Sequence, residues 1–157
     1  MALNYERIDV KLLAGSIASL PIDSTKAVLQ GNDFIQDTYI ASLKPGVVVT
    51  MDEKGFIKPA GAEADKCVLG FLVNDAAGYY NQNMNANSSH LAAVLVGGGN
   101  QFVTDNIKDN DIKPGAFLYV GTDGILTKTK GTLTTAVAVA LTANSATSKA
   151  VLVQTLI

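Results

Sequence analysis

The chain has 157 residues, of which 48% are hydrophobic and only 17% are charged, and its formal net charge at pH 7 is −2. This length suffices for one compact domain or for two small modules that share a core. The charged fraction lies below the roughly 25% of an ordinary soluble domain, so we expect part of the surface to be uncharged or covered by a partner. Arg7 is the single arginine and the lysines are scattered, which disfavours nucleic-acid binding.

Residues 1–30 are expected to form an N-terminal arm. Their apolar side chains follow no strict helix or strand period, and include Leu3, Ile8, Val10, Leu12, Leu13, Ile17 and Leu20. The arm lacks the basic start of a signal peptide, and the chain has no apolar run long enough to span a membrane, so we expect cytoplasmic synthesis and no membrane partner. Two arrangements stay open: an arm packed on a neighbouring subunit, or an extra edge strand on the protein's own sheet.

An internal duplication follows the arm. The phrase KPGVVVTMDEKGFIK at 44–58 matches KPGAFLYVGTDGILT at 113–127, at an offset of 69 residues. Upstream, GNDFIQD resembles GNQFVTD at an offset of 68, and downstream AVLV recurs at an offset of 57. Because these matches keep the same order, we predict two copies of one unit, residues 31–96 and 99–157. We therefore interpret the glycines between the copies, Gly97, Gly98 and Gly99, as a linker.

Each copy predicts β structure. In both KPG triplets, proline at the second position and glycine at the third favour a type II turn that starts a strand. A glycine-containing turn between apolar runs then indicates a hairpin. The expected strands cover 47–51, 56–58 and 67–73 in the first copy, and 116–120, 125–128 and 136–141 in the second. We therefore predict a mainly β protein of two tandem, pseudo-equivalent small β-barrel or sandwich modules; separate barrels and one fused sandwich remain alternatives.

The chain offers little that could carry chemistry. Cys67, the one cysteine, excludes an intrachain disulfide and is expected to be a buried structural thiol in its strand. His90 stands near serines, but no nucleophile turn accompanies it. The acidic residues Asp105, Asp109 and Asp111 lack EF-hand spacing, and a solvated turn is the favoured interpretation. We expect no enzyme activity, no cofactor and no metal site.

A polar, asparagine-rich loop at 74–90 separates the last two strands of the first copy. Long loops in compact domains are usually functional or mobile. Tyr79, Tyr80 and Met84 lie inside this loop and are candidate partner-contact residues, with plain disorder as the alternative. The other candidates for partner contact are in the arm: Leu3, Tyr5, Arg7, Ile8, Val10, Leu12 and Leu13.

The repeated unit resembles the small β-barrel head decoration, or cement, proteins of tailed bacteriophages. The resemblance covers residues 31–157 and rests on the KPG turn, the glycine-centred hairpin, the short strands VLGFLV and VAVALT, and the closing AVLV. It implies a virion structural protein that binds the outside of a capsid and stabilises the shell. The implied partners are the major capsid protein and further copies of the chain, as a trimer or a dimer. Two modules in one chain and the long loop depart from the usual family pattern.

Two other functions compete with this one. A tail-tube or baseplate component would form rings or tubes by itself. A carbohydrate-binding β module would present Tyr79 and Tyr80 as an exposed platform.

Overall fold

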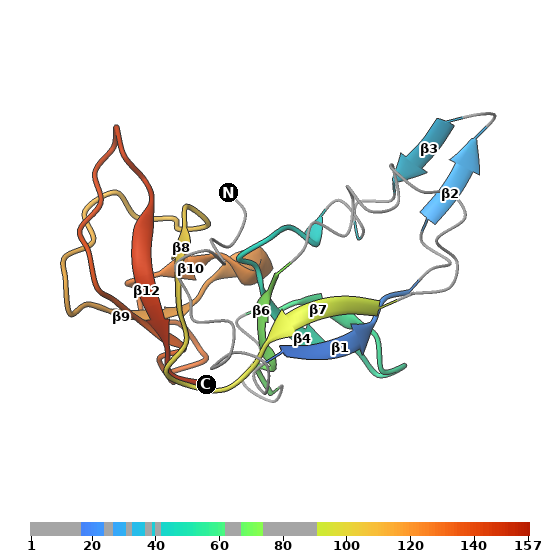
Figure 1. The fold of residues 1–157 in the computed structure, drawn as a ribbon, viewed down its shortest axis with the longest axis horizontal. Helices are drawn as coiled ribbons and strands as arrows, with labels where there is room; N and C mark the ends of the chain where they lie inside the picture. The colour runs from blue at the N-terminus through green and yellow to red at the C-terminus, as the bar shows by residue number, and fades with distance from the viewer. Residues whose placement is uncertain are drawn as a thin grey trace.

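The computed structural model describes residues 17–23, 27–30, 33–36, 39, 42–61, 67–73 and 91–157. Within these residues the protein is mainly β, with two five-stranded sheets and one two-stranded hairpin, and every ladder between named strands is antiparallel. The expected fold class is confirmed. Figure 1 shows the two sheets next to each other, with the hairpin of β2 and β3 projecting away from them.

The two sheets use the chain in succession. The first sheet contains β1 (Ile17–Pro21), β4 (Val48–Met51), β5 (Ile57–Pro59), β6 (Gly70–Leu72) and β7 (Leu91–Leu95). The second contains β8 (Gln101–Thr104), β9 (Phe117–Val120), β10 (Leu126–Thr127), β11 (Ala138–Ala140) and β12 (Val151–Thr155). The hairpin is formed by β2 (Ala27–Gln30) and β3 (Asp33–Gln36).

Both sheets have the same strand order, which confirms two tandem modules. The first runs β1-β7-β6-β4-β5, and the second, followed from β8, runs β8-β12-β11-β9-β10. The KPG turns begin β4 and β9 as expected. Gly46 and Gly115 both have φ of +84°, the positive φ of a type II turn, and in each turn the next residue donates to the lysine carbonyl, at 3.2 and 3.1 Å. Their N–H groups donate to Leu72 and Ala140 at 2.7 Å, so the ladders also coincide.

The structure corrects the two outer matches of the duplication. The block at 31–37 does not correspond to β8, because β3 pairs with β2 in the separate hairpin. The place of β8 is taken in the first sheet by β1, which pairs with β7 as β8 pairs with β12. Residues 17–21 of the expected arm are therefore an edge strand of the protein's own sheet, the second of the two arrangements left open.

The repeated AVLV is also shifted by two residues from its expected alignment. Val94 lies opposite Leu72, and Val153 lies opposite the equivalent Ala140, so the true offset between β7 and β12 is 59 and not 57. A shift of two residues keeps each side chain on the same face of a strand. The expected alignment is therefore wrong in register, although it matches residues that lie on the same face.

Hydrophobic packing covers the first sheet on both faces. On one face, the inner face, Val49, Ile57, Leu72 and Val94 are fully buried in a cluster that also includes Leu43. The side chains of the opposite, outer face enter a second cluster that continues into the second sheet. That shared cluster includes Val48, Phe71, Leu95, Phe102, Leu118, Leu126, Ala138, Ala140, Val151 and Val153. The two sheets therefore share one hydrophobic core.

Cys67 is exposed, so the expectation of a buried thiol is wrong. The strand was expected to start at residue 67, but β6 begins at Gly70. The backbone of Cys67 is nevertheless held, because its carbonyl accepts a hydrogen bond of 2.6 Å from the hydroxyl of the buried Thr50. The side chain itself points out of the core.

Candidate functional site

The partner-contact residues expected from the sequence all lie outside the described residues. This applies to the arm residues Leu3, Tyr5, Arg7, Ile8, Val10, Leu12 and Leu13, and to the loop residues Tyr79, Tyr80 and Met84. His90 lies outside them as well. The described residues supply three features that could serve a function: the joint between the modules, a polar loop in the second module, and the outer face of the second sheet.

The joint between the modules combines aromatic packing with backbone hydrogen bonds. Phe71 of β6 and Phe102 of β8 are both buried, and their rings meet edge-on with centroids 5.0 Å apart. At the hairpin tip of the second module, the Gly124 N–H donates to the Ala60 carbonyl at 2.7 Å. The Ala60 N–H donates in turn to Val48, so the tip extends the hydrogen-bonded edge of the first sheet. These contacts hold the modules in one fixed relative position.

Asn106 fastens the same joint through its side-chain amide. Its Nδ2 donates to the carbonyl of Gly46, in the KPG turn of the first module, at 3.2 Å. It also donates to the carbonyl of Gly124 at 3.1 Å. Its backbone N–H donates to the hydroxyl of the fully buried Thr104 at 3.0 Å. One side chain thus satisfies carbonyls from both halves of the chain.

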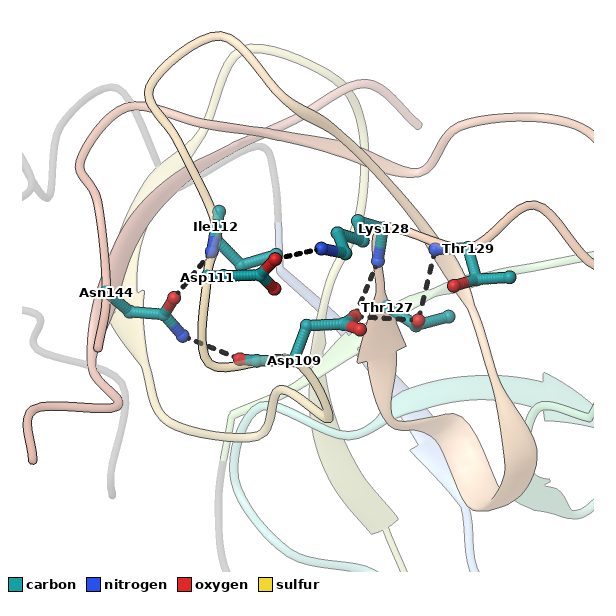
Figure 2. Close-up of polar contacts among 7 residues, drawn as sticks. All are labelled: Asp109, Asp111, Ile112, Thr127, Lys128, Thr129 and Asn144. Carbon is teal, nitrogen blue, oxygen red and sulfur yellow. Dashed lines mark hydrogen bonds and ion pairs between the residues drawn. The ribbon is translucent and has the colours of Figure 1, made fainter. Parts of the chain in front are cut away.

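The polar loop between β8 and β9 is held by its own residues and by neighbouring segments (Figure 2). The Asp109 carboxylate accepts hydrogen bonds of 2.8 Å from the Thr127 hydroxyl and from the Lys128 N–H. The Lys128 ammonium pairs with Asp111. These contacts account for Asp109 and Asp111 structurally, in agreement with a polar turn. Within the described residues, no three metal-ligating side chains gather into a group.

Asn144 closes this loop from the opposite side, as Figure 2 shows. Its Oδ1 accepts a hydrogen bond of 2.8 Å from the N–H of Ile112, whose side chain is buried. Its Nδ2 donates to the carbonyl of Asp109 at 2.8 Å and to that of Lys149 at 3.3 Å. The amide therefore joins the loop to the connection between β11 and β12.

The charged pair shifts one ionisation. The hydrogen bond from Lys128 is the main cause that lowers the pKa of Asp111 below its ordinary value of 3.8. Both side chains are exposed, so solvent screens the pair and its contribution to stability is small. The pair joins Asp111 of the loop to Lys128, which follows β10.

A hollow of about 440 Å³ lies beside the polar loop. It is lined by Lys108, Val120, Gly121, Thr122, Ile125, Thr127, Thr129 and Gly131. In this lining, the Thr127 hydroxyl donates a hydrogen bond to Asp109 and accepts one of 3.1 Å from the Thr129 N–H. Among the described residues that line it, Lys108 is the one ionisable group, so these residues direct no pair of acid and base groups into the hollow.

The outer face of the second sheet is the most exposed apolar feature of the described residues. Phe117 in β9 leaves 57% of its surface exposed. The half-buried Val139 of β11 lies directly opposite Phe117, and the half-buried Leu152 of β12 lies on the same face of the sheet. Large side chains of this kind on a sheet face mark candidate interaction surfaces. The alternation of small and branched residues in VAVALT indicates a branched face in the core, but the structure buries Ala138 and Ala140 and leaves Val139 half-buried.

No helix among the described residues has the length and hydropathy needed to cross a bilayer. Comparison with protein-family models, with curated proteins and with solved structures found no match to this chain.

Proposed function

We propose that the chain is a virion structural protein that binds the outside of a tailed-phage capsid and stabilises the shell. The observation that carries the proposal is the fusion of two equivalent β modules through one core. Such a unit offers a stiff body with repeated surfaces, which suits binding to a lattice. The resemblance of the repeat to decoration proteins gives the binding partner its identity, the major capsid protein.

Association, and not catalysis, is the mechanism that this function requires. Many copies bind across the boundaries between capsid subunits, and the summed contacts oppose the pressure of packaged DNA. Individually weak contacts gain strength when several form at once. The described ionisable groups of the polar loop support this view, because Asp109 and Asp111 are engaged by Thr127 and Lys128. A self-associating chain, as a trimer or dimer, would multiply the contacts further.

Electron microscopy of virions from the source, with gold-labelled antibody against this chain, tests the proposal. We expect label over the whole exterior of the head. Label confined to the tail or baseplate would contradict capsid binding and favour the competing virion role. Absence of the chain from purified virions would reject both.

A truncation tests whether the N-terminal arm binds the capsid. The deletion should remove residues 1–16 only, because β1 begins at Ile17 and is part of the first sheet. We expect the shortened chain to fold and to lose capsid occupancy in a pelleting assay. A matched variant with Tyr79→Ala and Tyr80→Ala measures the contribution of the long loop. Full occupancy by the truncated chain would remove the arm from the proposal.

A further inference from the structure

Four side chains form one row across the outer face of the second sheet. Val139 lies directly opposite Phe117 on one side and Gln154 on the other, and Gln154 lies opposite Gln101. Directly opposed residues point to the same face of a sheet. Phe117 is 57% exposed, Gln101 is exposed, and the other two are half-buried. The two glutamine amides bond to each other at 3.1 Å. We call these four residues the outer row.

The first sheet has an equivalent row in the same register. Phe71 lies opposite Val48 and Leu95, and Leu95 lies opposite Ile17. Val48 and Phe71 are fully buried and Leu95 is 1% exposed. What covers them is the second module, since all three belong to the shared cluster and Phe71 packs on Phe102. The chain therefore already contains one case in which a module of this type covers the outer face of another.

We infer that the outer row of the second sheet binds a second copy of this chain. The first reason is the equivalence itself: the same face of the same module is buried by a related module in one half of the chain and is exposed in the other. A second copy of the chain offers an identical exposed row, so two rows can meet about a two-fold axis in a closed, isologous contact.

The chemistry of the outer row favours the same occupant. The row has two apolar and two amide side chains and no charge. Contacts between identical chains tend to bring like residues close to one another, and an uncharged row meets its copy without repulsion between like charges. The amides of Gln101 and Gln154 supply donors and acceptors for the rim of such a contact. The inference does not rest on the proposed virion role, because it concerns the purified chain alone.

Sedimentation of the full-length chain over roughly a hundredfold range of concentration tests the inference. We expect a reversible oligomer for the wild type. Phe117→Gln should raise the dissociation midpoint by about tenfold or more, since an exposed aromatic at the centre of an interface is a typical dominant contact. Gln101→Glu should also weaken the oligomer, and added salt should restore it in part.

Leu91→Gln is the matched control. Leu91 in β7 is 50% exposed, comparable to Phe117, but it belongs to the first sheet. We expect this variant to associate like the wild type. A chain that stays monomeric throughout the range overturns the inference. So does an oligomer that survives Phe117→Gln, or one that Leu91→Gln weakens equally. Immunogold labelling of virions gives an independent answer on the virion role, so the two proposals can fail separately.

Discussion

The ring of Phe71 meets the ring of Phe102 with their centroids 5.0 Å apart and their planes at 62°. One ring belongs to the outer face of the first sheet, and the other belongs to the inner face of the second. Residues from both modules surround the pair in one buried cluster. The modules are therefore joined where two independent domains would have solvent between them, and we expect them to unfold together.

Phe71→Ala and Phe102→Ala test this joint. Each should lower the free energy of unfolding by about 3–5 kcal/mol, because each removes a large buried side chain and leaves a cavity. Their combined effect should be smaller than the sum by about 0.5–1.5 kcal/mol, the range found for aromatic pairs. Urea unfolding followed by tyrosine fluorescence and by circular dichroism measures these values. Two separate transitions in the wild type, or strict additivity, would contradict a shared core.

Gly124 and Gly55 form a matched pair for testing the contact of the hairpin tip. Both have positive φ, at +71° and +86°, so alanine is strained at either position. A Cβ at Gly124 would lie 2.4 Å from the Val48 carbonyl oxygen, whereas a Cβ at Gly55 would meet nothing within 4 Å. Gly55→Ala should cost about 1–2 kcal/mol from backbone strain alone.

Gly124→Ala should cost about 1–3 kcal/mol more than Gly55→Ala, because the tip must move away from the first sheet. The hydrogen bond from Gly124 to Ala60 would then weaken. Thermal unfolding of the two variants gives the difference, and hydrogen exchange at the Gly124 amide reports the local loss. Equal costs for both variants would mean that the tip does not depend on this contact.

Local turn chemistry made much of the fold predictable from the sequence. Proline and glycine fix the dihedral angles of the KPG turns by themselves, so β4 and β9 begin where expected. The edge strand β1 was harder to predict, because its partner β7 is far away in the sequence. Ile17, for example, pairs with Leu95, 78 positions later. Its sequence IASLP has no strict alternation, and the block at 31–37 matched residues 99–105 more closely. The similarity between short segments therefore identified the wrong counterpart of β8, whereas the strand order of the two sheets identifies β1.

The joint and the polar loop could not be predicted in the same way. Asn106 and Asn144 act by bonding carbonyls 60 and 35 residues away, at Gly46 and Asp109. An asparagine in a loop usually bonds its own neighbouring backbone, so neither residue stands out in the sequence. The start of the strand expected at 67–73 was also wrong. The sequence pattern placed it at Cys67, three residues before β6 begins at Gly70.

Asn144→Ala tests how firmly the polar loop is held. The change leaves the Ile112 N–H without its side-chain acceptor and the Asp109 carbonyl without its donor. We expect a loss of about 1–3 kcal/mol in unfolding free energy, the cost of leaving partly buried polar groups unsatisfied. Thr147→Ala is the control in the same connection, since Thr147 is exposed and should change stability by less than about 0.5 kcal/mol.

Hydrogen exchange of the Ile112 amide is a second measure of whether the Asn144 side chain holds the loop. Amide exchange at Ile112 should accelerate in Asn144→Ala and stay unchanged in Thr147→Ala. If Asn144→Ala matches the control in both stability and exchange, the loop is held by its other contacts, such as the hydrogen bond from the Lys128 N–H to Asp109 and the ion pair of Lys128 with Asp111.

Asp111→Asn tests the ion pair through its dependence on pH. Lys128 lowers the pKa of Asp111 in the folded chain, so the folded state favours the charged carboxylate. Such a group adds stability above its unfolded pKa, near 3.8, and the gain disappears as the pH falls through the lower folded value. The wild type should therefore exceed Asp111→Asn slightly in unfolding free energy at pH 7. The difference should vanish in acid, and it should shrink in high salt because both side chains are exposed. Urea midpoints at pH 7 and pH 3, each at low and high salt, measure the four values. A difference that persists unchanged at pH 3 would show that Asp111 acts through its shape or its hydrogen bonding and not through its charge.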